Sequence, residues 1–133
     1  MGATLVSRDE LLGRADVAII HLVLSERTRG LIGARELALM KPSAYLVNTP
    51  RGPIVDEAAL VRALRDGTIA GAGLDVFDEE PLPPGHSLRR LPNTVITPHL
   101  GYVTEETYRI FFGQALEDIE AFLRGAPVRV FKP

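Results

Sequence analysis

The sequence contains no cysteine, which excludes disulfide-stabilised scaffolds and metal sites built on thiolates. Its three histidines are scattered and lack the ligand spacing of a metal site, so we expect no metal. One sign of charge does not dominate either, because 15 Lys and Arg stand against 17 Asp and Glu, for a net charge of -2. The sequence therefore predicts neither a nucleic-acid partner nor a basic membrane-binding surface.

Long apolar stretches are also missing. The purely aliphatic run near the start covers residues 17–20, whereas a membrane-spanning helix needs about 20 apolar residues. The first ten residues show no basic region followed by an apolar stretch, so no secretory signal is expected. We predict a cytoplasmic protein with no membrane partner.

The remaining composition is typical of a globular protein. The 133 residues are 46% apolar and 24% charged, which is close to the average of folded domains and argues against disorder. A chain of this length forms one ordinary domain or part of a larger one.

Strand-like and helix-like segments alternate along the chain. Short apolar runs predict strands over residues 17–22, 44–48, 69–76 and 94–97. Helical patterns cover residues 8–14, 34–40 and 57–65, the first with a capping box and the third with Asp56 as its N-cap. This alternation predicts an α/β fold with a parallel sheet built from βαβ units.

A long helix is predicted over residues 104–124, ended by Gly125 and Pro127. We assign residues 104–133 to this C-terminal helix and its tail, and residues 1–103 to the sheet-containing domain. The helix carries an apolar stripe that we interpret as core packing: Tyr108, Phe111, Phe112, Ala115, Ile119, Phe122 and Leu123.

Ionisable side chains follow three consecutive predicted strands. Arg51 follows the second strand, the acidic run 78–80 follows the third, and His99 follows the fourth. Ligands of open parallel sheets bind beyond the carboxyl ends of the strands. Histidine can act as a general acid or base near neutral pH, and an arginine can hold a carboxylate with two hydrogen bonds. A substrate with a carboxylate next to a carbonyl or hydroxyl group suits this set.

Each of these residues has an ordinary explanation when taken alone. A turn arginine, an acidic loop and a histidine after a strand are usually solvated or structural residues. His86, in a proline-rich loop, we interpret as an ordinary surface residue, and His21 as structural or pocket-lining. The common position of Arg51, the acidic run and His99 at strand ends, each beside Pro or Gly, favours a functional group.

Five segments of the sequence, taken in order, resemble one protein family. Segments 15–32, 40–52, 55–60, 73–82 and 91–101 are similar to the carboxyl-terminal part of the D-isomer-specific 2-hydroxyacid dehydrogenases, which include glyoxylate/hydroxypyruvate reductases and phosphoglycerate dehydrogenases. The resemblance implies a partial doubly wound, Rossmann-like sheet with helices on both faces. Residues 1–103 would form the second half of the NAD(P)-binding domain.

The resemblance also implies roles for individual residues. Arg51 would bind the 2-oxo acid, His99 would exchange a proton with the substrate oxygen, and Glu80 would be the carboxylate partner of His99. Asp75 would reach the nicotinamide carboxamide. The remaining cofactor pocket would be lined mainly through backbone and packing by Leu22, Val23, Thr49, Pro50 and Gly101.

The dinucleotide fingerprint G-x-G-x-x-G does not occur in the sequence, and residues 71–73 lie in a predicted strand that opens no helix. We therefore expect the chain alone to bind NAD or NADP weakly or not at all, because the usual pyrophosphate site is missing. The strand over residues 17–22 would also have an unpaired edge. This favours a homo-oligomer or a partner that supplies a complementing N-terminal half.

Two functions therefore remain open. The chain is either a portion of an oxidoreductase that moves a hydride between a nicotinamide cofactor and a small 2-hydroxy or 2-oxo acid, inactive alone, or a non-catalytic globular or interaction module derived from that fold. Arg51, Glu80 and His99 favour the first function, and the missing glycine turn favours the second.

Overall fold

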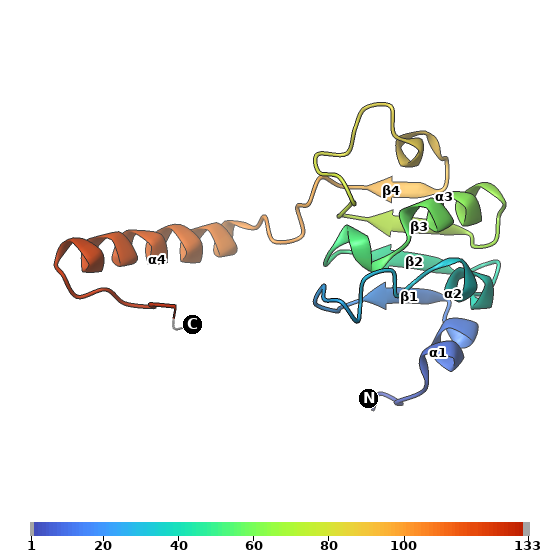
Figure 1. Ribbon diagram of the computed structural model, residues 1–133, viewed down its shortest axis with the longest axis horizontal. Coiled ribbons are helices and arrows are strands. Elements are labelled where there is room, and N and C mark those ends of the chain that lie inside the picture. Colours follow the sequence, from blue (N-terminus) through green and yellow to red (C-terminus); the bar gives the residue numbers. More distant parts are fainter. Residues whose placement is uncertain (1, 132–133) are drawn as a thin grey trace. The chain divides into compact units, whose positions relative to one another are not determined.

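The computed structural model describes residues 2–131. These residues form two units, one up to His99 and one from Leu100 onward, and each is described by itself. The first unit contains a sheet and its helices, and the second contains one long helix (Figure 1).

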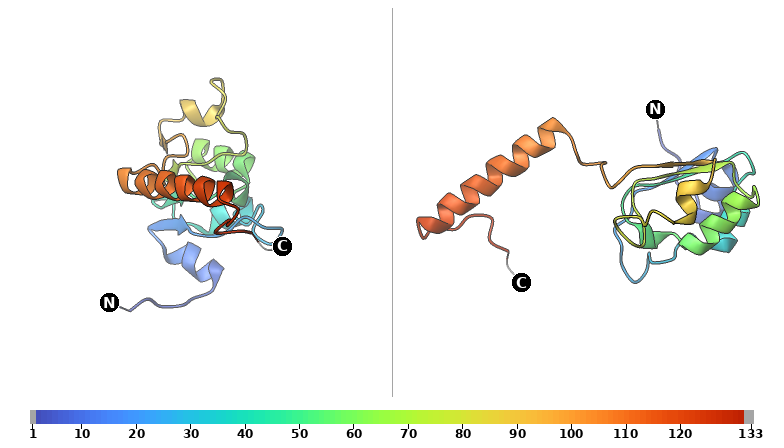
Figure 2. Two further views of the ribbon diagram at one scale, coloured as in Figure 1. Left: turned by 90° about the vertical axis from the view of Figure 1, so that its left-hand side faces the viewer. Right: turned by 90° about the horizontal axis from the view of Figure 1, so that it is seen from above.

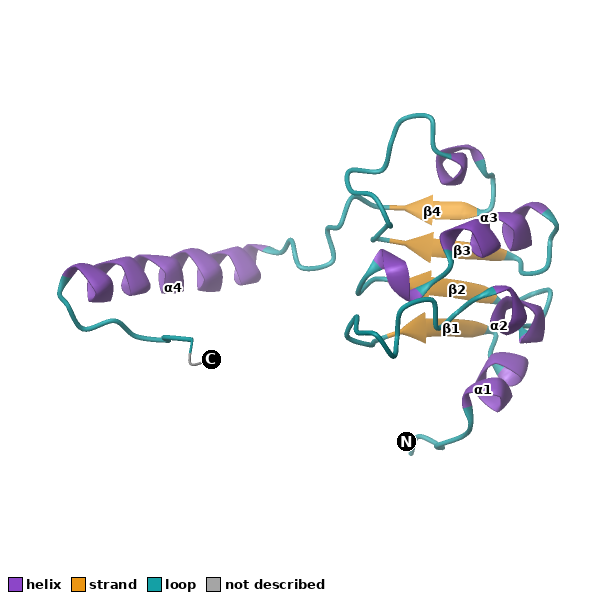
Figure 3. Ribbon diagram, viewed as in Figure 1, coloured by secondary structure: helices purple, strands orange, loops and turns teal. Residues whose placement is uncertain are grey.

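The sheet of the first unit has four parallel strands in chain order (Figure 3). They are β1 (Val17–Ile20), β2 (Tyr45–Asn48), β3 (Gly71–Leu74) and β4 (Thr94–Ile96). The register aligns Ile20 with Asn48, Asn48 with Leu74, and Leu74 with Ile96. The carboxyl ends of all four strands therefore reach the same edge, and the predicted parallel α/β sheet is confirmed.

The helices of this unit begin where the sequence provides caps. Helix α1 (Arg8–Arg14) starts after Ser7, whose hydroxyl accepts a hydrogen bond from the Glu10 amide at 3.2 Å. Helix α3 (Glu57–Arg65) starts after Asp56, whose carboxylate accepts from the Ala59 amide at 2.9 Å. The remaining helices are α2 (Ala34–Leu39) and the short 3-10 helices η1 (Gly52–Ile54) and η2 (Ser87–Arg90).

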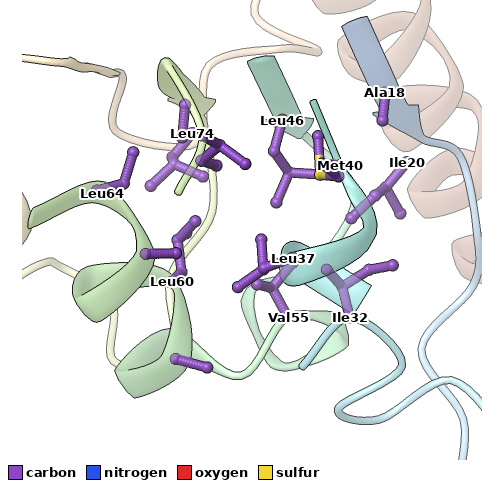
Figure 4. Packing of buried hydrophobic residues seen from close by; sticks show 14 of the residues in the cluster. Ala18, Ile20, Ile32, Leu37, Met40, Leu46, Val55, Leu60, Leu64 and Leu74 are labelled. Atoms are coloured by element: carbon purple, nitrogen blue, oxygen red, sulfur yellow. The ribbon is translucent and has the colours of Figure 1, made fainter. Parts of the chain in front are cut away.

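Helices α2 and α3 connect neighbouring strands and lie together on one face of the sheet (Figure 2). Right-handed crossovers that run in one direction across a sheet place their helices on the same face. Inward side chains of the strands, such as Ala18, Leu46 and Leu74, meet Leu37 and Leu60 of these helices (Figure 4). This layer forms the hydrophobic core.

The other face of the sheet is exposed. Val17, Ile19 and Tyr45 alternate with the buried strand residues and are 52%, 54% and 51% exposed, and Val95 is 72% exposed. The expected Rossmann-like class is correct, but within this unit the helices cover one face rather than both. The continuous apolar run at residues 17–20 gave no sign of this, because outward and inward residues are equally apolar.

The second unit consists mainly of helix α4 (Glu105–Leu123), capped by the Thr104 hydroxyl, which accepts from the Thr107 amide at 3.1 Å. The rings of Tyr108 and Phe112 stack at 5.5 Å. The helix was predicted correctly, but its apolar stripe is exposed, with Phe112 at 68% and Phe122 at 72%. Among the described residues of this unit no second layer covers the stripe, so its interpretation as core packing stays a prediction.

Candidate active site

Segments that follow three adjacent strands carry the ionisable residues of the candidate site. Thr49–Arg51 follow β2, Asp75–Glu80 follow β3, and residues 97–99 follow β4. Parallel pairing brings these segments to one edge of the sheet. The backbone there continues the ladder, since the Asp75 amide donates to the Asn48 carbonyl at 3.0 Å and the Thr97 amide to the Leu74 carbonyl at 2.9 Å.

His99 and Glu80 form a close pair. The Nδ1 atom of His99 lies 2.7 Å from Oε2 of Glu80, and the two side chains are about one third exposed, at 33% and 35%. The second carboxylate oxygen, Oε1, accepts a hydrogen bond from the Phe77 amide at 2.9 Å. Glu80 is thus held by its own loop while it contacts the imidazole.

The backbone of His99 is unusual. Its φ of 59° lies in the left-handed region, which costs a residue with a Cβ atom on the order of 1 kcal/mol or more. Such strain persists only where the surroundings enforce it, and it is concentrated at functional sites. His99 combines this backbone conformation with the 2.7 Å contact to Glu80.

Several groups act on the ionisation of Glu80. Partial burial raises its pKa, but the hydrogen bonds from His99 and from the Phe77 amide, together with the positive charges of His99 and Arg51, outweigh burial and lower it. Glu80 is therefore a carboxylate at neutral pH. Its Oε2 accepts a hydrogen bond from Nδ1 of His99 when that nitrogen carries the proton.

Arg51 lies in a turn that two neighbours fix. The buried Asn48 donates from Nδ2 to the Arg51 carbonyl at 3.0 Å. Gly52 packs so tightly that an added Cβ would lie 2.1 Å from the carbonyl carbon of Phe77. The guanidinium is exposed and donates from Nη1 to the Pro50 carbonyl at 2.6 Å. The turn that carries Arg51 thus rests against the backbone that holds Glu80.

A cavity of about 530 Å³ opens beside His99 and Glu80. Its walls combine apolar and ionisable side chains, namely Phe77, Leu82 and Ile96 with Glu80, His99 and Arg89. The predicted group of Arg51, a carboxylate and His99 is therefore brought to one edge of the sheet, and an acid–base pair meets a cavity of the size used for small molecules.

Comparison with known proteins is consistent with this geometry. A family model described as the NAD-binding domain of D-isomer specific 2-hydroxyacid dehydrogenases matches residues 1–101. The chain belongs to this family.

Individual relatives extend the match. The chain is 50% identical over 125 residues to the glyoxylate reductase of Aeropyrum pernix, covering 94% of this chain and 37% of that protein. The crystal structure of a putative D-3-phosphoglycerate dehydrogenase from Ralstonia solanacearum matches with a TM-score of 0.92 and 41% identity, over 98% of this chain and 38% of that one. The 2-hydroxyacid dehydrogenase of Xanthobacter autotrophicus, solved with NADPH, matches with a TM-score of 0.72 and 41% identity, over 91% of this chain and 49% of that one. The chain thus spans less than half the length of these relatives.

The predicted cofactor-lining residues of this dehydrogenase domain lie at the strand ends or beyond them. Strand β1 ends at Ile20, so Leu22 and Val23 lie in the following loop and are 44% and 84% exposed. Thr49 is exposed and Pro50 half-buried after β2. Gly101 belongs to the second unit. Their contact with a nicotinamide cofactor stays a prediction.

Asp75 fits the nicotinamide end of a cofactor by its chemistry. Its side chain is buried at the end of β3 and accepts a hydrogen bond from the Thr97 hydroxyl, and a carboxylate can accept in the same way from a carboxamide. The pyrophosphate end does not fit, because no helix among residues 2–131 begins at a G-x-G-x-x-G turn. The described residues suit one half of the cofactor.

Three contacts at the candidate site were not predicted from the sequence. Asn48 and Thr97 flank predicted residues and position them, and Gly52 permits a close backbone contact. The interpretation of His86 as an ordinary surface residue is wrong, because its Nε2 lies 3.0 Å from Oε1 of Glu57 and its Nδ1 accepts from the Leu88 amide at 3.3 Å. The Asn-Thr-x-Arg-Gly motif at residues 48–52 was the only sequence signal for these contacts, and it contains Asn48 and Gly52.

No helix within residues 2–131 has the length and apolar character needed to cross a bilayer. No three His, Asp or Glu side chains of the same range gather as metal ligands would.

Proposed function

We propose that the chain supplies the acid–base and substrate-orienting part of an enzyme that transfers a hydride between a nicotinamide cofactor and a small 2-hydroxy or 2-oxo acid. The observation that carries this proposal is the 2.7 Å contact between His99 and a Glu80 whose ionisation also senses Arg51. Membership in the dehydrogenase family and the relatives' names support the same reaction.

Arg51 orients the substrate in this proposal. Its planar guanidinium can hold a carboxylate through two parallel hydrogen bonds, which fixes direction as well as position. The Asn48 and Gly52 contacts limit the movement of the Arg51 turn relative to Glu80. The carbonyl or hydroxyl next to the bound carboxylate is thereby directed to the imidazole.

His99 and Glu80 manage the proton. In the reductive direction, protonated His99 donates from Nε2 to the carbonyl oxygen, and Glu80 stabilises the imidazolium through Nδ1. In the oxidative direction, neutral His99 accepts the hydroxyl proton at the same nitrogen. The nicotinamide, when bound, supplies or accepts the hydride.

The cofactor is NAD or NADP in this proposal, with Asp75 and the predicted pocket residues at the nicotinamide end. The described residues offer no glycine turn for the pyrophosphate, so we expect the 133-residue chain to bind the cofactor weakly. A complementing N-terminal half would then supply that turn, whereas a second copy, which lacks it as well, would cover only the unpaired edge of β1. The same missing turn favours the alternative function, a non-catalytic module.

A titration followed by NMR tests the proposal without requiring turnover. D-lactate added to the labelled chain is expected to shift the ring signals of His99, and Arg51→Gln is expected to abolish the shift. Arg27→Gln, an exposed arginine after β1, is the matched control and is expected to leave it intact. A His99 signal that ignores D-lactate, or an R51Q variant that responds like the parent, would refute the proposal and favour the non-catalytic module.

A further inference from the structure

The cavity beside His99 is larger than the smallest substrates of the proposed reaction require. Its volume of about 530 Å³ lies within the range of roughly 300–1,000 Å³ found for drug-sized ligands. An acid of two or three carbons would fill a small part of it. The cavity therefore has room for a longer substrate chain.

The charges around this cavity are unevenly matched. Glu80 is paired with His99 at 2.7 Å and accepts a hydrogen bond from the Phe77 amide at 2.9 Å. Arg89 lines the same cavity, but no carboxylate within residues 2–131 lies at ion-pair distance from it. Its hydrogen-bond acceptors within these residues are backbone carbonyls, which carry no net charge. One wall of the cavity thus presents an uncompensated positive charge.

The guanidinium of Arg89 is also held in place. Its Nε donates to the carbonyls of Leu82 and Pro83 at 3.2 and 3.1 Å, and its Nη2 donates to Leu82 at 2.6 Å. An arginine has five N–H donors in a rigid plane, so these bonds fix the plane and leave donors for another acceptor. Anchored arginines suit carboxylate and phosphate groups.

We propose that Arg89 binds a second anionic group on the substrate, so that the site selects 2-hydroxy or 2-oxo acids whose far end carries a carboxylate or a phosphate. The inference rests on the proposed function. Arg51 holds the first carboxylate, His99 meets the neighbouring oxygen, and the substrate chain passes the apolar wall formed by Phe77, Leu82 and Ile96 to reach Arg89.

Four acids test this inference by NMR titration of the full chain. D-lactate and D-glycerate carry one anionic group, D-malate carries a second carboxylate, and 3-phospho-D-glycerate carries a phosphate. We expect the two acids that carry a second anionic group to bind about tenfold more tightly, which is typical of one additional charged hydrogen bond. A gain for the phosphate acid alone would support the inference and identify phosphate as the second group.

Variants assign the gain to its residue. Arg89→Gln is expected to reduce the affinity for D-malate and 3-phospho-D-glycerate to that for D-lactate and D-glycerate, whereas Arg89→Lys retains part of the difference. Arg90→Gln is the matched control, because Arg90 donates to the Gly85 carbonyl at 2.8 Å and is outside the cavity lining. Retention by R89K shows that loss in R89Q reflects charge rather than a disturbed loop.

The outcomes separate the two proposals. If acids with a second anionic group bind no more tightly than acids with one, or if R90Q acts like R89Q, the inference about Arg89 is overturned while the proposed function stands. If no acid shifts His99, or Arg51→Gln changes none of the affinities, the proposed function fails first and the inference fails with it.

Discussion

The first unit contains two histidine–glutamate pairs that differ in their surroundings. His99 contacts Glu80 through Nδ1 at 2.7 Å, with a left-handed backbone and a cavity beside it. His86 contacts Glu57 through Nε2 at 3.0 Å, with an ordinary φ of -63° and its Nδ1 bound to the Leu88 amide. The second pair closes a loop and caps η2. The residue types alone therefore do not distinguish the two pairs, whereas the left-handed backbone of His99 does.

The largest expected difference between the pairs is in turnover. In a complex of this chain with a complementing N-terminal half that reduces a 2-oxo acid with NADH, His99→Gln should lower kcat by about 100- to 10,000-fold. This is the usual contribution of general acid–base catalysis. His86→Gln should change kcat less than about twofold, because its ring serves the loop. Initial-rate kinetics of the two variants provide the measurement. Equal losses in both would remove the distinction.

The close contact between Gly52 and the Phe77 backbone should not tolerate an added methyl group. Gly52→Ala would force a Cβ to within 2.1 Å of the Phe77 carbonyl carbon, so we expect a loss of about 1–3 kcal/mol in unfolding free energy, as for other overpacked sites. Urea unfolding measures it.

Gly73→Ala is the control for this substitution, because its Cβ would meet the Val47 side chain at an ordinary 3.7 Å. A stable G52A variant with unchanged Glu80 and His99 signals would contradict the close contact.

The second pair should matter for stability rather than for chemistry. His86→Ala removes the acceptor for the Leu88 amide and the contact with Glu57, and we expect a loss of about 1 kcal/mol. Thermal unfolding gives the value, and faster amide exchange at Leu88 should accompany it. The prediction fails if H86A melts with the parent while H99Q does not.

The smallest expected effect is the pH dependence of stability, because the pKa values of two carboxyl groups near the pairs, Glu80 and Asp78, are shifted in opposite directions. The pKa of Glu80 is lowered, so its stabilising contribution is complete above the ordinary value of 4.5 and is lost as pH falls through the lower folded-state value. Burial and the negative charge of Glu57 raise the pKa of Asp78. Its ionisation therefore destabilises the fold, and that penalty appears as pH rises through its raised value.

Matched substitutions test these signs. Asp78→Asn should stabilise the chain at neutral pH by about a few tenths of a kcal/mol, because the side chain is largely exposed, and the gain should vanish in acid. Glu80→Gln should destabilise at neutral pH and lose its effect in acid. Unfolding at a series of pH values decides between these slopes, and slopes of the same sign would contradict the assignment.

Local patterns predicted the elements of the fold well. Ser7 and Asp56 mark helix starts because their side chains satisfy amides one turn later, and both caps are present. The order of strands and helices indicated the parallel sheet, and strand ends located Arg51, the acidic run 78–80 and His99 because parallel strands share an edge. The family resemblance then singled out Glu80 within that run.

Contacts between distant segments could not be read in the same way. The bare sheet face at Val17 and Ile19 was hidden because outward and inward residues of that strand are alike. The pairing of His86 with Glu57 depends on how the loop before η2 folds back onto α3. The close approach of Gly52 to the Phe77 backbone likewise depends on tertiary packing. The residues around Gly52 and those around Phe77 do not predict it separately.

The positive φ of His99 separates what the fold tolerates from what the reaction needs. Glycine and asparagine adopt this backbone region more readily than histidine, so either replacement could preserve or improve folding while it removes the imidazole. Selection for a stable chain alone would therefore drift away from histidine at this position. A histidine retained there under such selection would be a sign that chemistry, and not architecture, keeps it.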